Sequence, residues 1–389
     1  MPVQYYGPRG YILMSGHPEA LDRGIPIAAP TELSIEAPHE KLFIRTHQTI
    51  EIWVQQMLDE VDFGRAVLSR ERVAENEISA VTHHMARVTS VLRLLTAHMD
   101  VLETLASTDF FDFRQNLFGA AGFDSFRFRE FEWALGLMDR GLTDYLTARC
   151  EHFVGAEESA EVGRRYQGFW ADRTDRVTDA STEELRRRRA ELEQRRSLRA
   201  LMFDWLARTP YPDPAGGRPD PQHRRAFIDR FTANFAAAYA RDIEQARAAD
   251  PAGPGAGHSA HSTGDIDAAI RRLHWFVDAP ERCALLFILQ FAHEPLLSWP
   301  AELLEGVLEL DQGVVTWRNR HIEMVAHVLG GGRLSTGGQK GSGLGYLRKT
   351  MLLRALPEAS DARSFLMGHR EARGMHPEVA WHGYRLAFE

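Results

Sequence analysis

The sequence is poor in cysteine. It has two cysteines, Cys150 and Cys283, in 389 residues. Two are too few for a disulfide framework or for a cysteine-ligated metal or iron–sulfur site. A chain without such a framework fits a reducing compartment, so we expect a cytoplasmic protein.

The sequence also lacks long apolar runs and an excess of basic residues. No segment approaches the ~20 apolar residues of a membrane-spanning helix. The first residues do not show the basic-then-apolar pattern of a signal peptide. Lysine and arginine number 46 against 54 acidic residues, which gives a net charge of −8, whereas nucleic-acid binders normally carry a basic stripe. We therefore expect no membrane span and no nucleic-acid partner.

Hydrophobic residues make up 44 % of the chain, enough for a substantial core. They recur every three or four positions almost throughout, which is typical of helices. Residues 41–62 and 82–106 each place such a stripe on one helical face, and further helices are predicted over 299–311 and 312–330. The pattern predicts an all-α helical bundle in a single domain, 1–389.

The middle of the chain has a different composition. A strongly charged helix at 183–199 is followed by a proline-rich linker at 210–221 and a segment rich in glycine, proline and alanine at 250–264. Residues 178–265 contain too little apolar sequence for a core of their own. We expect them to be an inserted helical and linker segment within the single domain.

Two histidines lie on apolar helical faces. His47 follows Phe43 by four residues, and His321 shares a stripe with Trp317, Met324 and Val328. Each could be an ordinary core histidine. Each could also serve chemistry, because a neutral imidazole accepts a hydrogen bond or proton near neutral pH. A single imidazole between apolar walls is also what the proximal ligand of a haem iron requires.

Arg129 lies among aromatic residues in 126–133, where its planar guanidinium could bind a carboxylate. It could equally be a surface arginine, and its neighbour Arg127 is as eligible. The glycine-dense stretch 330–343 lacks the Gly-Lys-Ser/Thr ending of a nucleotide loop. Such a loop can instead fold closely over a ligand, with Thr336 offering a hydroxyl.

Taken together, these segments resemble the tryptophan 2,3-dioxygenase family. Residues 40–62 resemble its first long helix, and 87–114 its second helix and the turn after it. GFDSFRFREFEWALG (122–136) is similar to its substrate-carboxylate motif. WRNRHIEMVAHVLG (317–330) and STGGQKGSG (335–343) are similar to the haem-ligand helix and the threonine-glycine loop. The blocks stand in family order and cover about a third of the chain.

The resemblance implies an enzyme that binds haem b and uses O2 to open the indole ring of L-tryptophan, giving N-formylkynurenine. His321 would bind the haem iron as its proximal ligand. His47 would accept a hydrogen bond from the indole N–H, and Phe43 would pack against the indole ring.

The remaining site residues implied by the resemblance hold the amino-acid end of the substrate. Arg129 would pair with the carboxylate and Thr336 would contact the head group. Tyr6 and Tyr11 would close the pocket of a neighbouring subunit, in what the resemblance implies is a homotetramer.

Departures from the family pattern leave two other hypotheses open. The N-terminal block has two extra residues between Tyr6-Gly7 and Tyr11, and the glycine loop carries Gln339 and Lys340 in place of small hydroxyl residues. A haem-dependent monooxygenation or rearrangement of a substituted indole is one alternative. A non-catalytic haem-binding sensor or scaffold is the other.

Overall fold

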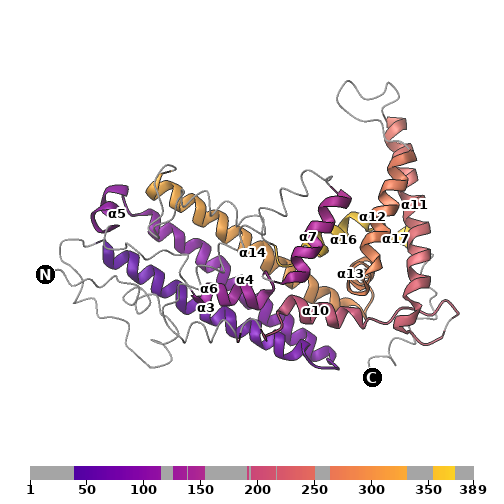
Figure 1. The fold of residues 1–389 in the computed structure, drawn as a ribbon, viewed down its shortest axis with the longest axis horizontal. Coiled ribbons are helices and arrows are strands. Elements are labelled where there is room, and N and C mark those ends of the chain that lie inside the picture. Colours follow the sequence, from indigo (N-terminus) through magenta and orange to yellow (C-terminus); the bar gives the residue numbers. More distant parts are fainter. Residues whose placement is uncertain are drawn as a thin grey trace. The chain divides into compact units, whose positions relative to one another are not determined.

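The computed structural model describes residues 39–114, 126–153, 191–249, 263–330 and 354–372, apart from positions 138, 192–193 and 216. Every element of these residues is an α- or 3-10 helix, and the one β-bridge among them joins Tyr211 to Asp220. The prediction of an all-α protein is therefore confirmed (Figure 1).

The chain divides into two compact units. Unit 1 comprises 1–70, 80–199 and 306–355, and unit 2 comprises 71–79, 200–305 and 356–389. Three of the five divisions fall inside helices, in α4 (Glu75–Glu103), α10 (Leu198–Ala207) and α14 (Ser298–Leu329). The single domain with an insertion at 178–265 stays a prediction.

Unit 1 is built around α3 (Glu40–Leu68), α4, α6 (Phe126–Leu135) and the part of α14 that begins at Gly306. The apolar stripe of α3 is buried, with Val54, Met57 and Val61 at 0 % exposure, and α3 packs against α6. Glu40 in its first turn and Arg65 in its last complement the helix dipole. Two shorter described helices also belong to the unit, α5 (Ser107–Arg114) and α7 (Arg140–Phe153).

Polar contacts join the long helices of unit 1 to one another. Glu60 of α3, 3 % exposed, accepts two hydrogen bonds of 2.9 Å from Arg87 of α4. Arg320 of α14 donates to Glu103 and Asp100 of α4 at 2.6 Å. These pairs align α4 with both of its neighbours.

A glycine sets the approach of α14 to α4. A Cβ added at Gly313 would lie 3.2 Å from Cδ1 of Leu92, closer than most real contacts of this kind. The sequence analysis ended one helix near this glycine and began another. The structure instead has one helix through 298–329, and the missing side chain at Gly313 leaves space for the fully buried Leu92.

Unit 2 is a smaller helical cluster. Its helices are α11 (Arg224–Ala249), α12 (Thr263–Asp278), α13 (Pro280–Gln290), α16 (Pro357–Ala362) and α17 (His369–Ala372), with 3-10 turns at Pro221–His223 and Arg363–Phe365. Prolines at the first turns of α13 and α16 suit positions where no backbone N–H is needed. Buried aromatic residues form its core: Phe227, Phe231, Phe276, Phe287 and Phe365.

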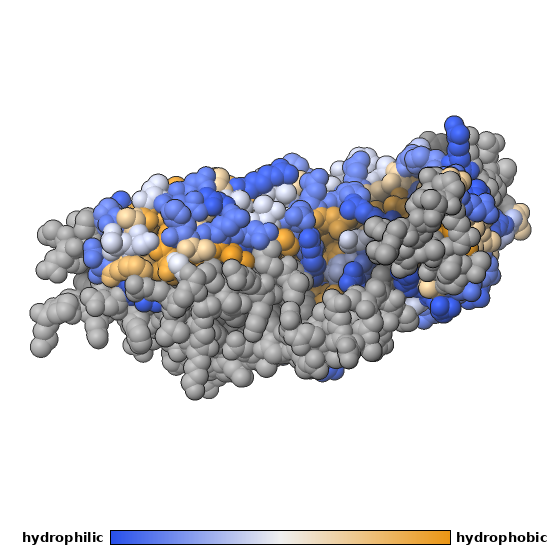
Figure 2. Space-filling model, turned by 90° about the horizontal axis from the view of Figure 1, so that it is seen from above, coloured by the Kyte–Doolittle hydropathy of each residue, from blue (hydrophilic) through white to orange (hydrophobic). Residues whose placement is uncertain are grey.

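Hydrophilic residues cover much of the described surface in Figure 2, with hydrophobic patches between them. The exposed large apolar side chains include Ile52, Leu94 and Val101, at 41–46 % exposure. Among the described helices, none has the length and apolar character to cross a membrane.

Candidate functional site

The first half of the candidate site lies on α3. The rings of Phe43 and His47 stand 4.1 Å apart, one helical turn from each other. Phe43 also contacts two aromatic residues of α5, with ring centroids 5.7 Å from Phe110 and 5.6 Å from Phe113. Phe43 is therefore held in an aromatic cluster that fixes the helix face on which His47 lies.

One hydrogen bond determines the protonation of the His47 ring. Its Nδ1 lies 2.8 Å from the carbonyl oxygen of Phe43, and a carbonyl can only accept, so Nδ1 carries the proton and donates. Burial lowers the pKa of His47 and repulsion from His98 lowers it further, against the raising effect of this hydrogen bond. The ring is neutral at pH 7, and its Nε2 keeps a lone pair.

The second half of the site is His321 on α14. Its ring is stacked on Trp317 at 5.5 Å, with 29° between the planes. Burial lowers the pKa of His321 to about 4, and repulsion from His47 is the second cause. The fold thus brings His47 and His321 close enough for their charges to interact, although 274 positions separate them in the sequence.

The imidazole of His321 is suited to bind a metal. It is neutral over the whole physiological range, because its pKa is near 4. Neither ring nitrogen forms a hydrogen bond with another described residue. Both histidine rings keep part of their surface accessible, although burial among protein atoms is the largest cause of both pKa shifts.

Trp317 adds a polar group that the sequence analysis did not identify. The residue is 8 % exposed, and its indole N–H is buried without a hydrogen-bond partner among the described residues. Its ring contacts both His321 and Phe128 of α6, the latter at 4.8 Å. A buried unpaired N–H costs free energy. A bound group that accepts its hydrogen bond would remove this cost, and a haem, which carries two carboxylates, offers such acceptors.

The predicted arginine lies on α6. Arg129 is in this helix, and its side chain is outside the described residues. Arg127, the alternative in the sequence analysis, is 2 % exposed. Three residues after Arg129, Glu132 is 0 % exposed and accepts a 2.8 Å hydrogen bond from Arg318 of α14. This ion pair was not predicted from the sequence. The only signal for it is that Glu132 follows Arg129 by three residues and Arg318 precedes His321 by three.

Three predicted residues cannot be placed. Tyr6, Tyr11 and Thr336 all lie outside the described residues. Their roles stay predictions.

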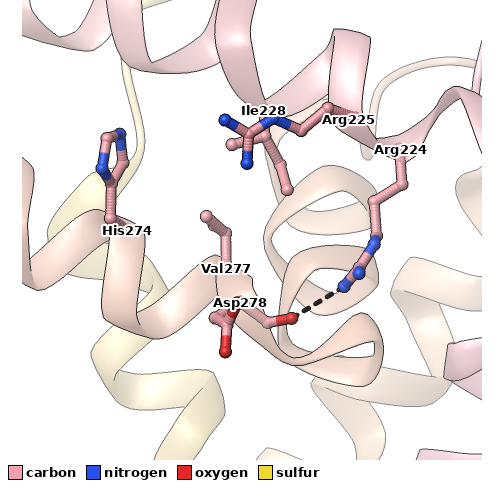
Figure 3. Close-up of a pocket in the computed structure, with 6 residues that line it drawn as sticks. All are labelled: Arg224, Arg225, Ile228, His274, Val277 and Asp278. Carbon is pink, nitrogen blue, oxygen red and sulfur yellow. Dashed lines mark hydrogen bonds between the residues drawn. The ribbon is translucent and has the colours of Figure 1, made fainter.

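A separate pocket of about 170 Å³ lies in unit 2, between α11 and α12 (Figure 3). Arg224 donates a 2.9 Å hydrogen bond to the backbone oxygen of Asp278, and Arg225 forms a 3.2 Å ion pair with Asp229. His274 faces the same space. None of the predicted site residues lines this pocket.

Comparison with known proteins decides the family. A profile described as tryptophan 2,3-dioxygenase matches residues 29–167. Tryptophan 2,3-dioxygenase 2 of Ralstonia nicotianae is 30% identical over 345 residues, which cover 84% of this chain and 85% of that protein. The chain belongs to the tryptophan 2,3-dioxygenase family.

More distant members align over the same length. The tryptophan 2,3-dioxygenase of Sorangium cellulosum is 29% identical, with 84% of this chain and 76% of that protein covered. The one from Anopheles gambiae is 27% identical over 84% of this chain and 78% of its own. The resemblance found in the sequence is confirmed, and the chain belongs to a family of oxidoreductases. The profile match contains Phe43, His47 and Arg129 and ends before His321.

Proposed function

We propose that this protein is a haem-dependent dioxygenase that cleaves the 2,3 bond of the indole of L-tryptophan to give N-formylkynurenine. The observation that carries the proposal is the pairing of two neutral, deeply placed imidazoles, His47 on α3 and His321 on α14, within one helical unit.

The residues present fit haem b. His321 offers a neutral imidazole to the iron, and Trp317 beside it has an indole N–H free to donate to the edge of the group. When bound, the haem supplies the binding and activation of O2. The protein's own task is to hold the substrate in a productive orientation and to exclude water.

On the substrate side, His47 is prepared to accept a hydrogen bond. Nδ1 donates to the carbonyl of Phe43, so Nε2 is an acceptor, which matches the N–H of an indole. The low pKa keeps it an acceptor at neutral pH. Phe43, 4.1 Å from the imidazole, offers its ring face to the same indole.

The amino-acid end of the substrate would be held by residues that the resemblance assigns. Arg129 of α6 would pair with the carboxylate, and Thr336 would contact the head group. Tyr6 and Tyr11 of one subunit would close the pocket of the next, in a cytoplasmic homotetramer. Each charge-assisted hydrogen bond to the substrate is worth roughly 1.5–3 kcal/mol.

Turnover of L-tryptophan by the haem-loaded protein, with O2 and a reductant, tests the proposal. Mass spectrometry of the product should show two added oxygen atoms, in N-formylkynurenine. A product with one added oxygen atom would contradict dioxygenation and support the monooxygenase alternative. A haem-loaded protein that leaves tryptophan and other indoles unchanged would contradict both and favour a haem-binding sensor.

A further inference from the structure

A buried ion pair connects the two helices that carry the proposed carboxylate and iron ligands. The side chain of Glu132 on α6 is 0 % exposed and that of Arg318 on α14 is 3 % exposed. Nη2 of Arg318 donates a 2.8 Å hydrogen bond to Oε1 of Glu132. They are 186 positions apart in sequence. The pair is a purely tertiary link within unit 1.

Each member of the pair is three residues from a proposed site residue on its own helix. Glu132 follows Arg129 by three residues, and Arg318 precedes His321 by three. Residues three apart on an α-helix share a face and are about one turn apart. One ion pair therefore lies one turn from the proposed carboxylate ligand on α6 and one turn from the proposed iron ligand on α14.

A second contact supports the same interface. The rings of Phe128, about one turn before Glu132 on α6, and Trp317, the residue before Arg318 on α14, lie 4.8 Å apart. Two contacts of different kinds thus fix how α6 is positioned along α14. An ion pair has stricter geometry than an apolar contact, because the guanidinium and the carboxylate must meet at hydrogen-bonding distance.

Stability alone is a poor reason to keep such a pair. Removing two charges from water is costly, and apolar side chains of similar volume often serve a core as well or better. What an ion pair provides that they do not is a single register between the two helices. This register sets the distance between a carboxylate bound on α6 and an iron bound on α14.

We infer that Glu132 and Arg318 are positioning residues, which hold the carboxylate-binding segment at a fixed distance from the haem-ligand helix. The inference rests on the proposed function. It assigns the pair a role in substrate recognition, distinct from any contact with the substrate itself.

The test compares two ligands of the ferric, haem-loaded protein. L-tryptophan and tryptamine share the indole and ammonium groups, but tryptamine has no carboxylate. Their dissociation constants are measured from the change each causes in the haem absorption spectrum. In Glu132→Gln, the constant for tryptophan should rise about tenfold, because small misplacements of a binding group cost about that much or more. The constant for tryptamine should stay within about twofold of the unaltered protein's.

A control is available in a second ion pair that involves α14. Glu103 of α4 accepts a 2.6 Å hydrogen bond from Arg320 of α14, and both side chains are 25% exposed. Glu103→Gln removes an ion pair that also ties α14 to a neighbour, two residues from Arg318. It should leave both constants unchanged.

Glu132→Gln leaves Arg318 buried without its carboxylate and could fail to fold. The double variant Glu132→Leu/Arg318→Met removes both charges of the pair together, which costs less than leaving one of them buried alone, and it should fold. It is expected to show the same loss for tryptophan alone. Native tryptophan affinity in this double variant would overturn the inference, as would an equal loss for both ligands.

Failure of this inference can be distinguished from failure of the proposed function. If the unaltered haem-loaded protein binds no tryptophan, the proposed function fails before any variant is compared. If tryptamine causes no spectral change in the unaltered protein, cyanide binding to the ferric haem is measured in place of tryptamine binding. Unchanged cyanide affinity with weakened tryptophan supports the positioning role, and a parallel loss of both contradicts it.

Discussion

The carbonyl oxygen of Phe43 accepts a hydrogen bond from Nδ1 of His47 at 2.8 Å, while the two rings lie 4.1 Å apart. One residue thus sets both the tautomer of the imidazole and the aromatic surface beside it. The remaining lone pair, on Nε2, is the feature on which the proposed recognition of the indole depends.

His47→Ala should weaken L-tryptophan binding by about 1 kcal/mol, because one hydrogen bond to the indole N–H is lost. The binding of 1-methyltryptophan, which has no indole N–H, should be similar in the two proteins or improve in the variant. Spectral titrations of the haem-loaded proteins give all four constants. Equal losses for both ligands would show that His47 does not contact the indole N–H.

Trp317→Phe should have opposite effects in the haem-free and haem-loaded proteins. Without haem, the substitution removes a buried, unpaired N–H and should leave the free energy of unfolding unchanged or raise it by up to about 1 kcal/mol. With haem, it removes the proposed donor and should lower haem affinity. Urea unfolding and haem titration measure the two effects. A variant that binds haem as tightly as the unaltered protein would remove Trp317 from the haem site.

The haem-free protein should lose stability on mild acidification. Burial lowers the pKa of His321 in the folded state to about 4, against 6.5 as the reference value. The unfolded state therefore binds more protons between these values. The contribution of the neutral histidine is fully present above about pH 6.5 and is lost as the pH falls towards 4.

For His321 alone, the free energy of unfolding should fall by about 2 kcal/mol from about pH 7 to about pH 5. Other titrating groups add their own pH dependence. The comparison with His321→Gln, whose side chain does not titrate, isolates the histidine. The two proteins should differ in pH dependence by this amount; parallel stability curves would show that His321 is not held neutral by burial.

Two glycines of α14 should respond differently to a side chain. Gly313→Val should lower the free energy of unfolding by about 1–3 kcal/mol, because even a Cβ would press on the buried Leu92 at 3.2 Å. Gly306→Ala meets Thr82 at an ordinary 3.7 Å and should raise stability by up to about 1 kcal/mol through helix propensity. Denaturant unfolding measures both. A destabilised Gly306→Ala would mean that α14 lies closer to α4 than described.

Periodicity was sufficient to predict the long helices α3 and α4 and to place His47 and His321 on apolar helical faces, because both depend on neighbours within one or two turns. It could not distinguish Arg127 from Arg129, because burial depends on tertiary packing; Arg127 is buried, and the side chain of Arg129 lies outside the described residues. Nor could it pair Glu132 with Arg318, which only the folding of distant segments brings together.

The organisation of the chain was harder to derive for the same reason. The low apolar content of 178–265 shows only that this segment has too few apolar residues to form a core without residues from elsewhere in the chain. Phe227 and Phe231 on α11 complete a core with Phe287 and Phe276, which lie beyond it in the chain. The sequence pattern divided α14 into helices over 299–311 and 312–330, whereas the structure has one helix in which Gly313 packs against Leu92.

The central claim is that His321 holds a haem iron, and a haem titration of the unaltered protein and His321→Ala tests it most directly. The unaltered protein should bind haem with a Soret band that shifts on addition of L-tryptophan. His321→Ala should lose most of its haem affinity and recover it when free imidazole is supplied as the missing ligand. Unchanged haem affinity and an unchanged Soret band in His321→Ala would contradict the claim.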